Sequence, residues 1–207
     1  KRIGLGRPQE LIDRLGLEHT RVVLPTREYY VIIAGLDQEF PPEDLPAAAA
    51  RFYGDPTHEL RVVGVTGTNG KTTTAFLVRA LLEAAGIPTG LLGTVKSVVG
   101  GVDEPVERTT PEAIDLQATF RRMLDAGDRA CAMEVSSHAL ELGRAEGIHF
   151  ACRIFTNLTQ DHLDFHETME AYFAAKSKLF EGGDGARVVN VDDEYGRRLA
   201  DGSITYG

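Results

Sequence analysis

A glycine-rich loop between an apolar run and an amphipathic stretch is the feature that most constrains the fold of this chain. Residues 61–66 read RVVGVT, which is typical of a buried strand, and residues 67–74 read GTNGKTTT. Residues 71–85 predict a helix, since Gly86 stands just past its end and Pro88 follows. A strand, a glycine turn and a helix in this order place backbone N–H groups around a phosphate, so we predict a phosphate loop.

Three residues of this loop match the roles that phosphate loops give them. Gly70 lets the backbone approach a phosphate, Lys71 would reach the terminal phosphates, and the hydroxyl of Thr72 would bind magnesium. The strict pattern G-x-x-x-x-G-K-[ST] is not met, because Val65 stands where the first glycine would be. The alternative interpretation is a glycine turn that carries a surface lysine.

Strand-like and helix-like segments alternate after the loop, which predicts an α/β fold with a mostly parallel sheet and flanking helices. One helix should begin at Thr110 as its N-cap, with Pro111 in its first position, and end at Gly127. An acidic, glycine-rich turn precedes it at residues 100–107. The apolar stripe of this helix comprises Leu116, Phe120, Met123 and Leu124. The other predicted elements are strands at residues 90–95, 129–135, 152–157 and 187–191, and a helix at residues 168–180.

The first part of the chain, residues 1–59, reads as a small and incomplete α/β segment with a linker. Helices are expected at residues 8–15 and 45–53 and a strand at residues 29–33, while FPPEDLP reads as the linker. At the other end, SITYG follows a helix-like stretch without an obvious closing element. We therefore expect the second domain, residues 60–207, to be incomplete.

Composition narrows the classes of function. The net charge of −9 argues against a nucleic-acid groove and favours small-molecule chemistry. The sequence contains no apolar run of about eighteen residues and no signal-peptide pattern, so we expect no membrane insertion and a place in the cytoplasm. Cys131 and Cys152 lie in apolar runs, which favours buried free thiols over a disulfide or a metal site.

A lysine stands in the middle of an apolar helix face. At about 100° per residue, Lys178 points away from this face, whereas Lys176 lies among Met169, Tyr172, Phe173, Leu179 and Phe180. A buried cation is costly unless it is paired, neutralised or snorkels to water. Snorkelling is one interpretation. The other is a modification or a partner, for which Glu134 and His162 offer an environment; carbamylation by carbon dioxide would make Lys176 an anion able to hold magnesium.

Two polar clusters follow predicted strands directly, at the sheet edge where α/β proteins bind ligands. In EVSSHALELGR, Glu134 is suited to magnesium, directly or through water, and the alternative is a helix cap by Ser136 or Ser137. The second cluster, TNLTQDHLDFH, holds Asn157, Asp161, His162, Asp164 and His166. It contains no ligand triad at helical spacing that would suit zinc, and hard oxygen ligands with one histidine suit magnesium better.

Five segments, in this order and spacing, resemble the central domain of the Mur ligases. They are TGTNGKTTT, TTPEAIDLQ, MEVSSHALELGR, FTNLTQDHLDFH and YFAAKSKLF. The resemblance covers residues 60–207. The phosphate loop is shared with folylpolyglutamate ligases, whereas the other segments together point to the ligases that add the third peptide residue in peptidoglycan precursor synthesis.

The resemblance implies an ATP-dependent amide-bond ligase. ATP would phosphorylate the D-glutamate side-chain carboxylate of UDP-MurNAc-L-Ala-D-Glu, and the amine of a diamino acid would attack the acyl phosphate. The diamino acid would be meso-diaminopimelate or L-lysine, with the more widespread diaminopimelate preferred. Catalysis would be mainly positioning and charge neutralisation. ATP and Mg²⁺ are the implied cofactors, and we expect a monomer.

The same resemblance gives each candidate residue a role. Lys71 would bind phosphates, Lys176 would be the carbamylated lysine, and His162 would be the third catalytic residue. Arg144 would supply a bidentate cation for a carboxylate or phosphate. The ATP loop would comprise Gly67, Thr68, Asn69, Gly70, Lys71, Thr72 and Thr73. The substrate residues would be Thr109, Thr110, Ser136 and Arg144. The magnesium ligands would be Thr72, Glu134, His162 and carbamylated Lys176.

The sequence departs from the family pattern in places. Leu142 stands where some relatives have a glutamine, two residues before the substrate arginine. Residues 1–59 lack the Asp-Ser-Arg stretch of the uridine-binding domain, so we expect them to be only part of that domain. The C-terminal domain that holds the amino acid is expected to be absent. Residues 1–207 alone should therefore turn over little substrate.

Three alternatives stay open. A folylpolyglutamate synthase or the ligase half of cyanophycin synthetase shares the loop, but TTPE and EVSSHAL count against it. A non-catalytic nucleotide-binding module would bind nucleotide without depending on the dipeptide substrate, and Lys71, Glu134, His162 and Lys176 argue against such decay. A P-loop phosphotransferase or GTPase has less support, because no base-recognition motif of that kind is present.

Overall fold

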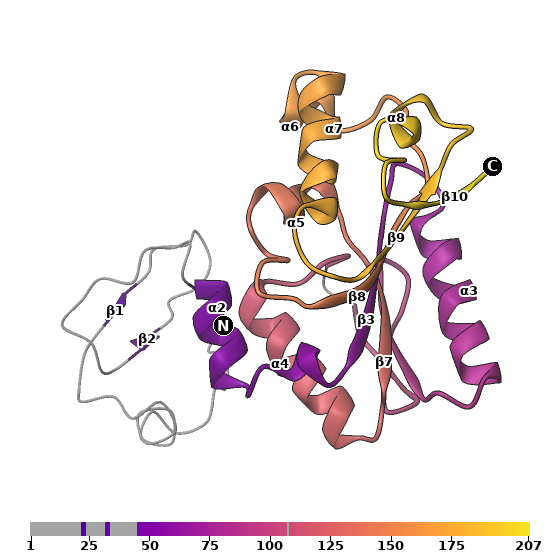
Figure 1. Cartoon of the computed structure of the whole chain (residues 1–207). Helices are drawn as coiled ribbons and strands as arrows, with labels where there is room; N and C mark the ends of the chain where they lie inside the picture. Colours follow the sequence, from indigo (N-terminus) through magenta and orange to yellow (C-terminus); the bar gives the residue numbers. More distant parts are fainter. Residues whose placement is uncertain (1–21, 24–31, 34–44, 107) are drawn as a thin grey trace.

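The computed structural model describes residues 22–23, 32–33, 45–106 and 108–207, and its main part is one eight-stranded sheet with helices on both faces (Figure 1). The strands are β3 (Arg61–Thr66), β4 (Thr89–Leu92), β5 (Ser97–Val99), β6 (Val102–Glu104), β7 (Ala130–Glu134), β8 (Phe150–Phe155), β9 (Ala186–Asn190) and β10 (Ile204–Tyr206). Their order is β10-β9-β8-β3-β7-β4-β5-β6. Every pair from β10 to β4 is parallel, and β5 is antiparallel to β4 and β6. The predicted mostly parallel α/β fold is confirmed.

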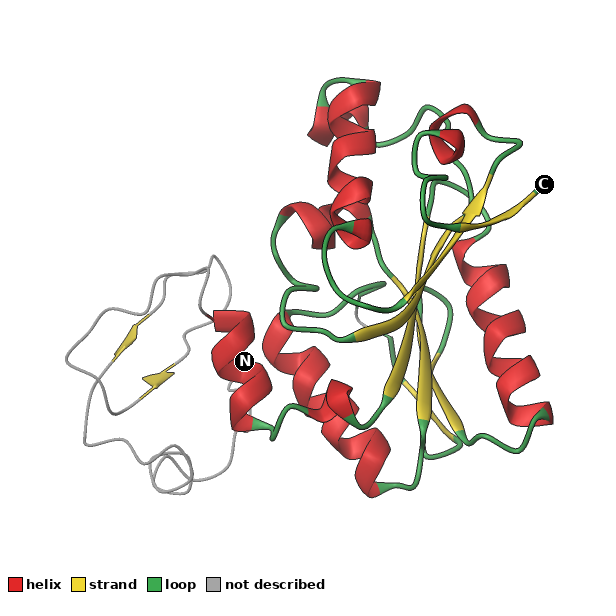
Figure 2. Cartoon of the chain, viewed as in Figure 1, coloured by secondary structure: helices red, strands yellow, loops and turns green. Residues whose placement is uncertain are grey.

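Helices cover the two faces of the sheet unequally. The α-helices are α2 (Leu45–Phe52), α3 (Lys71–Ala84), α4 (Ala113–Asp125), α5 (Ser137–Glu141), α6 (Leu163–His166), α7 (Met169–Ser177) and α8 (Glu194–Arg197), and the 3-10 turns are η2 (Pro56–His58) and η3 (Lys178–Phe180). Figure 2 shows α3 on one side of the sheet and α4, α5 and α7 on the other. No helix within the described ranges combines the length and hydropathy that crossing a bilayer requires.

Both faces of the central strands are buried, which explains their nearly continuous apolar sequence. Along β3, Val62 packs into a core with Phe120 of α4, whereas Val65 packs into a second core with Ala75 of α3. The predicted inner stripe of α4 is buried throughout. Cys131 is a buried free thiol, as predicted, whereas Cys152 is a free thiol that is only half-buried.

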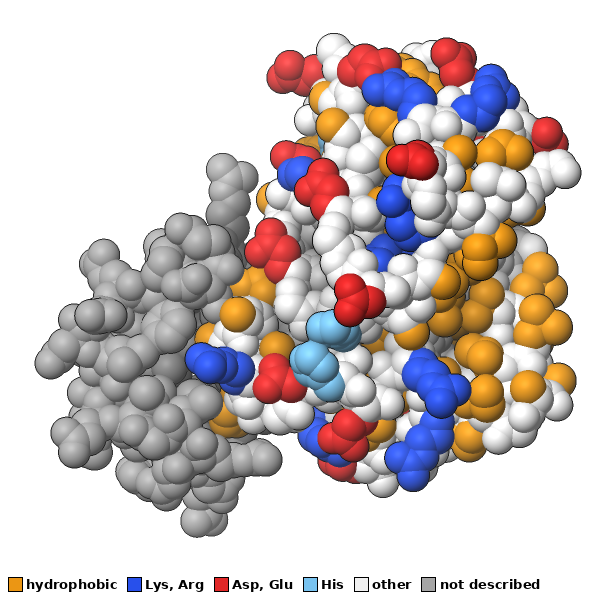
Figure 3. Space-filling model, viewed as in Figure 1, with side chains coloured by type: hydrophobic (Ala, Val, Ile, Leu, Met, Phe, Trp, Pro, Cys, Tyr) orange, Lys and Arg blue, Asp and Glu red, His pale blue; other side chains and the backbone are white. Residues whose placement is uncertain are grey.

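The outward face of α3 carries apolar side chains. Phe76, Leu77 and Leu81 are exposed on it. Figure 3 shows hydrophobic side chains gathered on this side of the molecule. A patch of this kind on a helix is typical of a surface that contacts another protein segment.

The register of the parallel strands places the ends of three of them together. Val65 of β3 is opposite Glu134 of β7, and Thr66 is opposite Phe155 of β8. The residues that follow β3, β7 and β8 therefore meet at one edge of the sheet, which is where the sequence places its motifs.

Little of the first predicted segment falls within the described residues. β1 (Val22–Val23) and β2 (Ile32–Ile33) form an antiparallel pair. The second of them contains the end of the strand predicted at residues 29–33. The helix predicted at residues 45–53 is confirmed as α2, and the helix predicted at residues 8–15 lies outside the described residues.

Two sequence predictions about elements are corrected by the structure, and one strand was not predicted. Thr110 does not cap α4, because that helix begins at Ala113 with Glu112 as a cap residue that makes no side-chain bond. Residues 100–107 are not all turn: the turn is at Gly100 and Gly101, and β6 follows it and pairs with β5 to form a hairpin. Within SITYG, Ile204–Tyr206 form the edge strand β10, which is parallel to β9. In each case pairing with a distant segment decides the local structure.

Candidate functional site

Two glycines give the loop at residues 67–70 a backbone that other residues rarely adopt. Gly67 has a φ of 146° and Gly70 a φ of 84°, both in the left-handed region that favours glycine. A Cβ atom on Gly67 would lie 1.9 Å from Oγ1 of Thr156. Gly70 is the N-cap of α3, and the first N–H groups of a helix have no carbonyl partner within it. These groups are therefore available to an anion.

The segment after β8 holds this loop in place. The carbonyl of Asn157 accepts from Thr68 N at 2.8 Å, and its Oδ1 accepts from Asn69 N at 3.0 Å. Its Nδ2 and Oγ1 of Thr156 both donate to the carbonyl of Asn69, at 3.1 and 2.7 Å. The amide of Thr159 donates to Oγ1 of Thr68 at 3.0 Å. The polar cluster predicted after β8 thus supports the loop.

Two lysines converge on one carbonyl oxygen of the loop. Nζ of Lys71 donates to the carbonyls of Gly67 and Thr68, at 2.9 and 2.8 Å. Nζ of Lys176 donates to the same Gly67 oxygen at 2.9 Å. Burial lowers the pKa of the Lys71 ammonium, and the negative charge of Glu134 opposes that shift. A bound phosphate would compete with these carbonyls for Lys71.

The side chain of Lys176 is enclosed by protein. Its exposed fraction is 1%, and Nζ lies 4.6 Å from the centre of the Tyr172 ring. Snorkelling to water is therefore the wrong interpretation of this lysine. Burial, with the charge of Lys71, lowers the pKa of Lys176 to about 7. Much of the amine is neutral near neutral pH, and the neutral form is the one that reacts with carbon dioxide.

Glu134 ends β7 as a buried carboxylate with an exposed fraction of 1%. Its Oε1 accepts from the amide of Thr94 at 2.8 Å, and its Oε2 accepts from Oγ1 of Thr94 at 3.1 Å. A Cβ atom on Gly93 would lie 2.4 Å from Oε1. The loop after β4 therefore fixes the orientation of this carboxylate.

The predicted substrate residues Thr109, Thr110 and Ser136 form a network with Glu134. Oγ1 of Thr109 lies 3.0 Å from Oγ1 of Thr94. Oγ1 of Thr110 donates to the Glu134 carbonyl at 3.0 Å and accepts from the amide of Ser136 at 3.1 Å. Ser136 also caps α5 through its own hydroxyl, so the capping interpretation is correct and coexists with the network.

Arg144 reaches the same region but is partly engaged. Its Nη2 lies 2.9 Å from Oε1 of Glu112. Its Nε is buried and has no hydrogen-bond partner in the part of the chain that the structure describes. The guanidinium therefore keeps a donor for an additional carboxylate or phosphate oxygen.

The histidines of the second cluster divide into two kinds. His162 is exposed, with a φ of 51°, and its Nε2 lies 3.5 Å from Oδ2 of Asp161. His166 is buried, and its Nε2 lies 2.9 Å from Oγ of Ser137. The ring of His138 lies between them, 5.0 Å from His162 and 5.6 Å from His166. Burial lowers the pKa of both His138 and His166. Of these three histidines, His162 is exposed, His138 is half-buried and His166 is buried.

Known proteins share the sequence pattern of this chain. The sequence pattern of the Mur ligase middle domain matches residues 65–204. The chain belongs to the Mur ligase family. The UDP-N-acetylmuramoyl-L-alanyl-D-glutamate--2,6-diaminopimelate ligase of Clostridium perfringens is 49% identical over 155 residues, which are 75% of this chain and 32% of that protein. The protein of the same name from Synechococcus elongatus is 55% identical over 155 residues, 74% of this chain and 31% of its own length. This Mur ligase chain spans about a third of the length of these relatives.

Solved structures share the fold. A structure of a UDP-N-acetylmuramoyl-L-alanyl-D-glutamate--2,6-diaminopimelate ligase matches with a TM-score of 0.70 and 27% identity, over 84% of this chain and 38% of that one. The FolC protein of E. coli, in complex with DHPP and ADP, matches with a TM-score of 0.62 over 99% of this chain and 52% of that one. Its identity of 17% shows a shared fold alone.

The donor atoms of this Mur ligase chain fit magnesium. No three His, Cys, Asp or Glu side chains converge on one point in the described residues. Mg²⁺ usually binds through one or two carboxylates with water and substrate phosphates, so a small donor set is sufficient. Glu134 supplies a carboxylate, and Thr72, at the start of α3, supplies a half-buried hydroxyl. Thr73 beside it is exposed, and His162 and Lys176 remain predicted ligands.

Sequence reasoning missed the residues that position the Mur ligase site. Gly93 and Thr94 hold Glu134, Thr156 and Thr159 hold the phosphate loop, and Glu112 engages Arg144. The available signal was position, because Gly93 and Thr94 directly follow β4, at the same edge of the sheet as the recognised motifs.

Proposed function

We propose that this chain is the nucleotide-binding catalytic part of an ATP-dependent ligase that joins meso-diaminopimelate to UDP-MurNAc-L-Ala-D-Glu. The names of relatives at about half identity support this substrate pair. The observation that carries the catalytic proposal is the convergence of Lys71 and Lys176 on the carbonyl of Gly67 beside the free N-terminus of α3. In that arrangement, the N-terminus of α3 and Lys71 would bind a phosphate, and Lys176 beside them has a lowered pKa.

The phosphate side of the reaction follows from the loop. The N–H groups of residues 70–73 would bind the terminal phosphates, and Lys71 would leave its loop carbonyls to neutralise them. Magnesium, held by Thr72, Glu134, His162 and carbamylated Lys176, would withdraw charge from the transferring phosphoryl group. A carboxylate of the dipeptide would take that group, and ADP would leave.

The amide side of the reaction needs a positioned acyl phosphate. Thr109, Thr110 and Ser136 present hydroxyl groups beside Glu134, and Arg144 keeps an unpaired Nε. These groups would hold the dipeptide nucleotide while the amine attacks the acyl carbon. Phosphate would then leave and the amine would lose a proton, which gives the amide. Binding of this kind contributes by orientation.

Lys176 would act as a carbamate. Its neutral Nζ would form a bond to the carbon of carbon dioxide and lose one proton to solvent, which converts a buried amine into an anion. A carbamate oxygen is a hard ligand of the kind that magnesium prefers. The lowered pKa of Lys176 supports this step.

The test is phosphate release from ATP by the protein that contains this chain, with UDP-MurNAc-L-Ala-D-Glu present or absent and with diaminopimelate or lysine as acceptor. We expect release that needs the dipeptide nucleotide and diaminopimelate together. Lys71→Ala should abolish it, with Arg79→Ala, a variant on the same helix, as the matched control. Release that ignores the dipeptide nucleotide would rule out the proposed substrate.

The same experiment separates the alternatives. The fold shared with FolC supports a folate-type ligase only if a folate replaces the dipeptide nucleotide as the required substrate. A nucleotide-binding module would bind ATP but release no phosphate under any condition. We further propose that the protein acts in the cytoplasm and that it is a monomer. Sedimentation of the purified protein would check the oligomeric state.

A further inference from the structure

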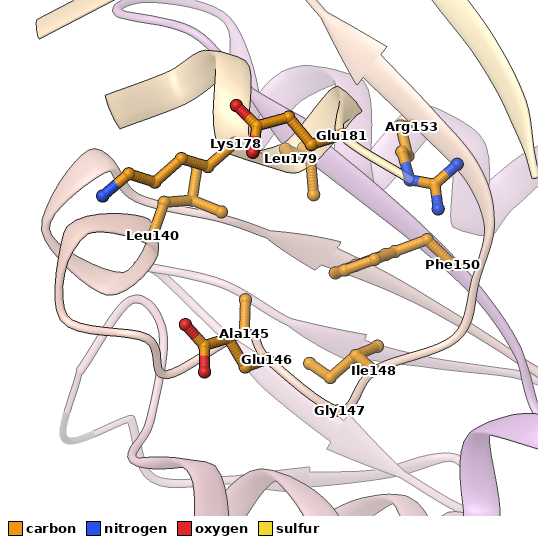
Figure 4. A pocket seen from close by; sticks show the side chains of 10 residues that line it. All are labelled: Leu140, Ala145, Glu146, Gly147, Ile148, Phe150, Arg153, Lys178, Leu179 and Glu181. Atoms are coloured by element: carbon orange, nitrogen blue, oxygen red, sulfur yellow. The ribbon is translucent and has the colours of Figure 1, made fainter. Parts of the chain in front are cut away.

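A cavity lies away from the phosphate loop. It has a volume of about 470 Å³ and is formed by α5, the segment that leads into β8, β8 itself and the turn η3. Its lining comprises Leu140, Ala145, Glu146, Gly147, Ile148, Phe150, Arg153, Lys178, Leu179 and Glu181, and shares no residue with the candidate site (Figure 4). Pockets that bind small molecules have volumes of about 300–1,000 Å³ and a largely apolar lining with a few polar groups. This cavity has such a volume, and its lining combines apolar side chains with four charged ones, Glu146, Arg153, Lys178 and Glu181.

One end of the cavity holds a buried cation. Arg153 has an exposed fraction of 5%, and its guanidinium lies 5.9 Å from the centre of the Phe150 ring. Figure 4 shows the two side chains together at one end of the pocket. Nη1 donates to the carbonyl of Gly185 at 3.2 Å, whereas Nε is buried and has no hydrogen-bond partner among the residues described. A buried guanidinium donor without an acceptor costs free energy, so this end favours an anionic ligand.

A second arginine strengthens the preference of this end for an anionic ligand. Arg187 of β9 is in register with Arg153 of β8, so both side chains leave the sheet on the same face. Nε of Arg187 is also buried and without a partner in the described part of the chain. Burial and the charge of Arg187 lower the pKa of Arg153, and Asp184 offsets only part of this. A carboxylate beside Arg153 would relieve the repulsion between the two cations.

The other end of the cavity is acidic. Glu146 is exposed, and Figure 4 shows it on the opposite side of the pocket from Arg153. No ion pair of Glu146 is present among the residues that the structure describes. The neighbouring cation, Lys178, is neutralised by Glu141, since its Nζ lies 2.8 Å from Oε2 of that residue. Leu140, Ile148 and Leu179 provide the apolar surface between the two ends.

We propose that this cavity binds an amino acid with an extended apolar chain, its carboxylate at Arg153 and an ammonium group at Glu146. A simple anion fits less well, because Glu146 would repel it at the acidic end. A simple ammonium compound fits less well, because it would leave Nε of Arg153 without an acceptor. The proposal does not depend on the ligase reaction, because the cavity has its own lining.

The test uses the 207-residue chain and three ligands of matched length, namely 6-aminohexanoate, hexanoate and hexylammonium. Binding is followed by NMR titration of backbone amides. We expect saturable shifts around residues 145–153 with 6-aminohexanoate and affinities at least about tenfold weaker for the two compounds that lack one charge. Equal affinity for all three, or no saturable shift with 6-aminohexanoate, would overturn the proposal.

Variants separate the two ends of the site. Glu146→Gln lies on the surface and should weaken 6-aminohexanoate about tenfold, while hexanoate, which Glu146 repels, should bind no more weakly than before. Arg153→Lys keeps the positive charge but loses the forked N–H donors of the guanidinium. It should therefore weaken the binding of 6-aminohexanoate and of hexanoate. Asp201→Asn, an exposed change outside the lining, is the matched control and should change neither affinity. If Glu146→Gln binds all three ligands as the unchanged chain does, the assignment of the ammonium end is wrong.

Discussion

Lys71 and Lys176 donate to the same carbonyl oxygen, that of Gly67, each at 2.9 Å. Two ammonium groups at one acceptor repel each other, and the more buried one loses its proton more easily. Lys176 is that one, with a pKa lowered to about 7. Much of Lys176 is therefore a neutral amine at neutral pH, whereas an exposed lysine is charged.

The first prediction is a pH dependence of stability that originates in Lys176. Its pKa is about 7 in the folded chain against 10.5 as the ordinary value. Between these pH values the unfolded chain binds more protons than the folded chain, so the free energy of unfolding rises with pH across this window. Below pH 7 the folded chain carries the full cost of burying a charged Lys176. Lys176→Met should raise the free energy of unfolding at pH 6 by roughly 1–4 kcal/mol. Urea unfolding in buffer free of carbon dioxide measures it.

The control for this experiment is Lys178→Met, an exposed lysine two residues away. This variant should change the free energy of unfolding little at any pH, since a surface ion pair contributes about 0–1 kcal/mol. Lys71 also has a lowered pKa and adds a slope of the same sign, so the difference between wild type and Lys176→Met is the quantity to compare. If that difference is the same at pH 6 and pH 10, Lys176 titrates normally and the prediction fails.

The second prediction concerns the carbamate. Lys176→Ala should reduce ligase activity strongly, because the anion is lost, and small carboxylic acids should restore part of it by occupying the space. A carbamate signal in the carbon NMR spectrum of protein exposed to labelled carbon dioxide should disappear in the same variant. Unchanged activity in Lys176→Ala, without any added acid, would contradict the role of this residue.

The third prediction concerns the phosphate loop. Gly67→Ala should abolish nucleotide binding and destabilise the chain by more than about 2 kcal/mol, because the Cβ atom would lie 1.9 Å from Oγ1 of Thr156. Gly86→Ala is the matched control. Gly86 also has a positive φ, of 76°, but an added Cβ would meet nothing within 4 Å, so its cost is conformational, about 1 kcal/mol. Calorimetric ATP titration and thermal unfolding of both variants test the difference.

The sequence predicts the part of the site that lies in continuous motifs. The alternation of strand-like and helix-like segments predicts the sheet, and the glycine-rich loop pattern predicts the role of Lys71. Glu134 stands out because it follows an apolar strand, and Lys176 because it interrupts an apolar helix face. The burial of Lys176 at 1% exposure confirms that its position was informative. Local residue order carries this information, because strand ends and helix faces follow from it.

The remaining features depend on contacts between distant segments. Thr94 is 40 residues from Glu134, and Asn157 is 88 residues from Asn69, so neither pair is visible in local spacing. Thr110 has the residue type of an N-cap, but its hydroxyl bonds to the Glu134 carbonyl instead. The edge strand β10 forms because β9 offers it a parallel partner, not because SITYG has a strong strand pattern. Tertiary pairing overrides local propensity in each case.

The last prediction concerns the grip of Thr94 on Glu134. Thr94→Val keeps the backbone amide bond to Oε1 but removes the hydroxyl bonds to Oε2 and to Thr109. Loss of a partner that orients a metal ligand typically weakens metal affinity 10- to 100-fold, so the magnesium concentration for half-maximal activity should rise about tenfold or more. Thr94→Ser retains the hydroxyl and should behave like the wild type. A magnesium titration of phosphate release compares the three proteins. If Thr94→Val and Thr94→Ser give the same magnesium dependence, the hydroxyl does not position the carboxylate, and Glu134 is held by its burial and by the amide of Thr94 alone.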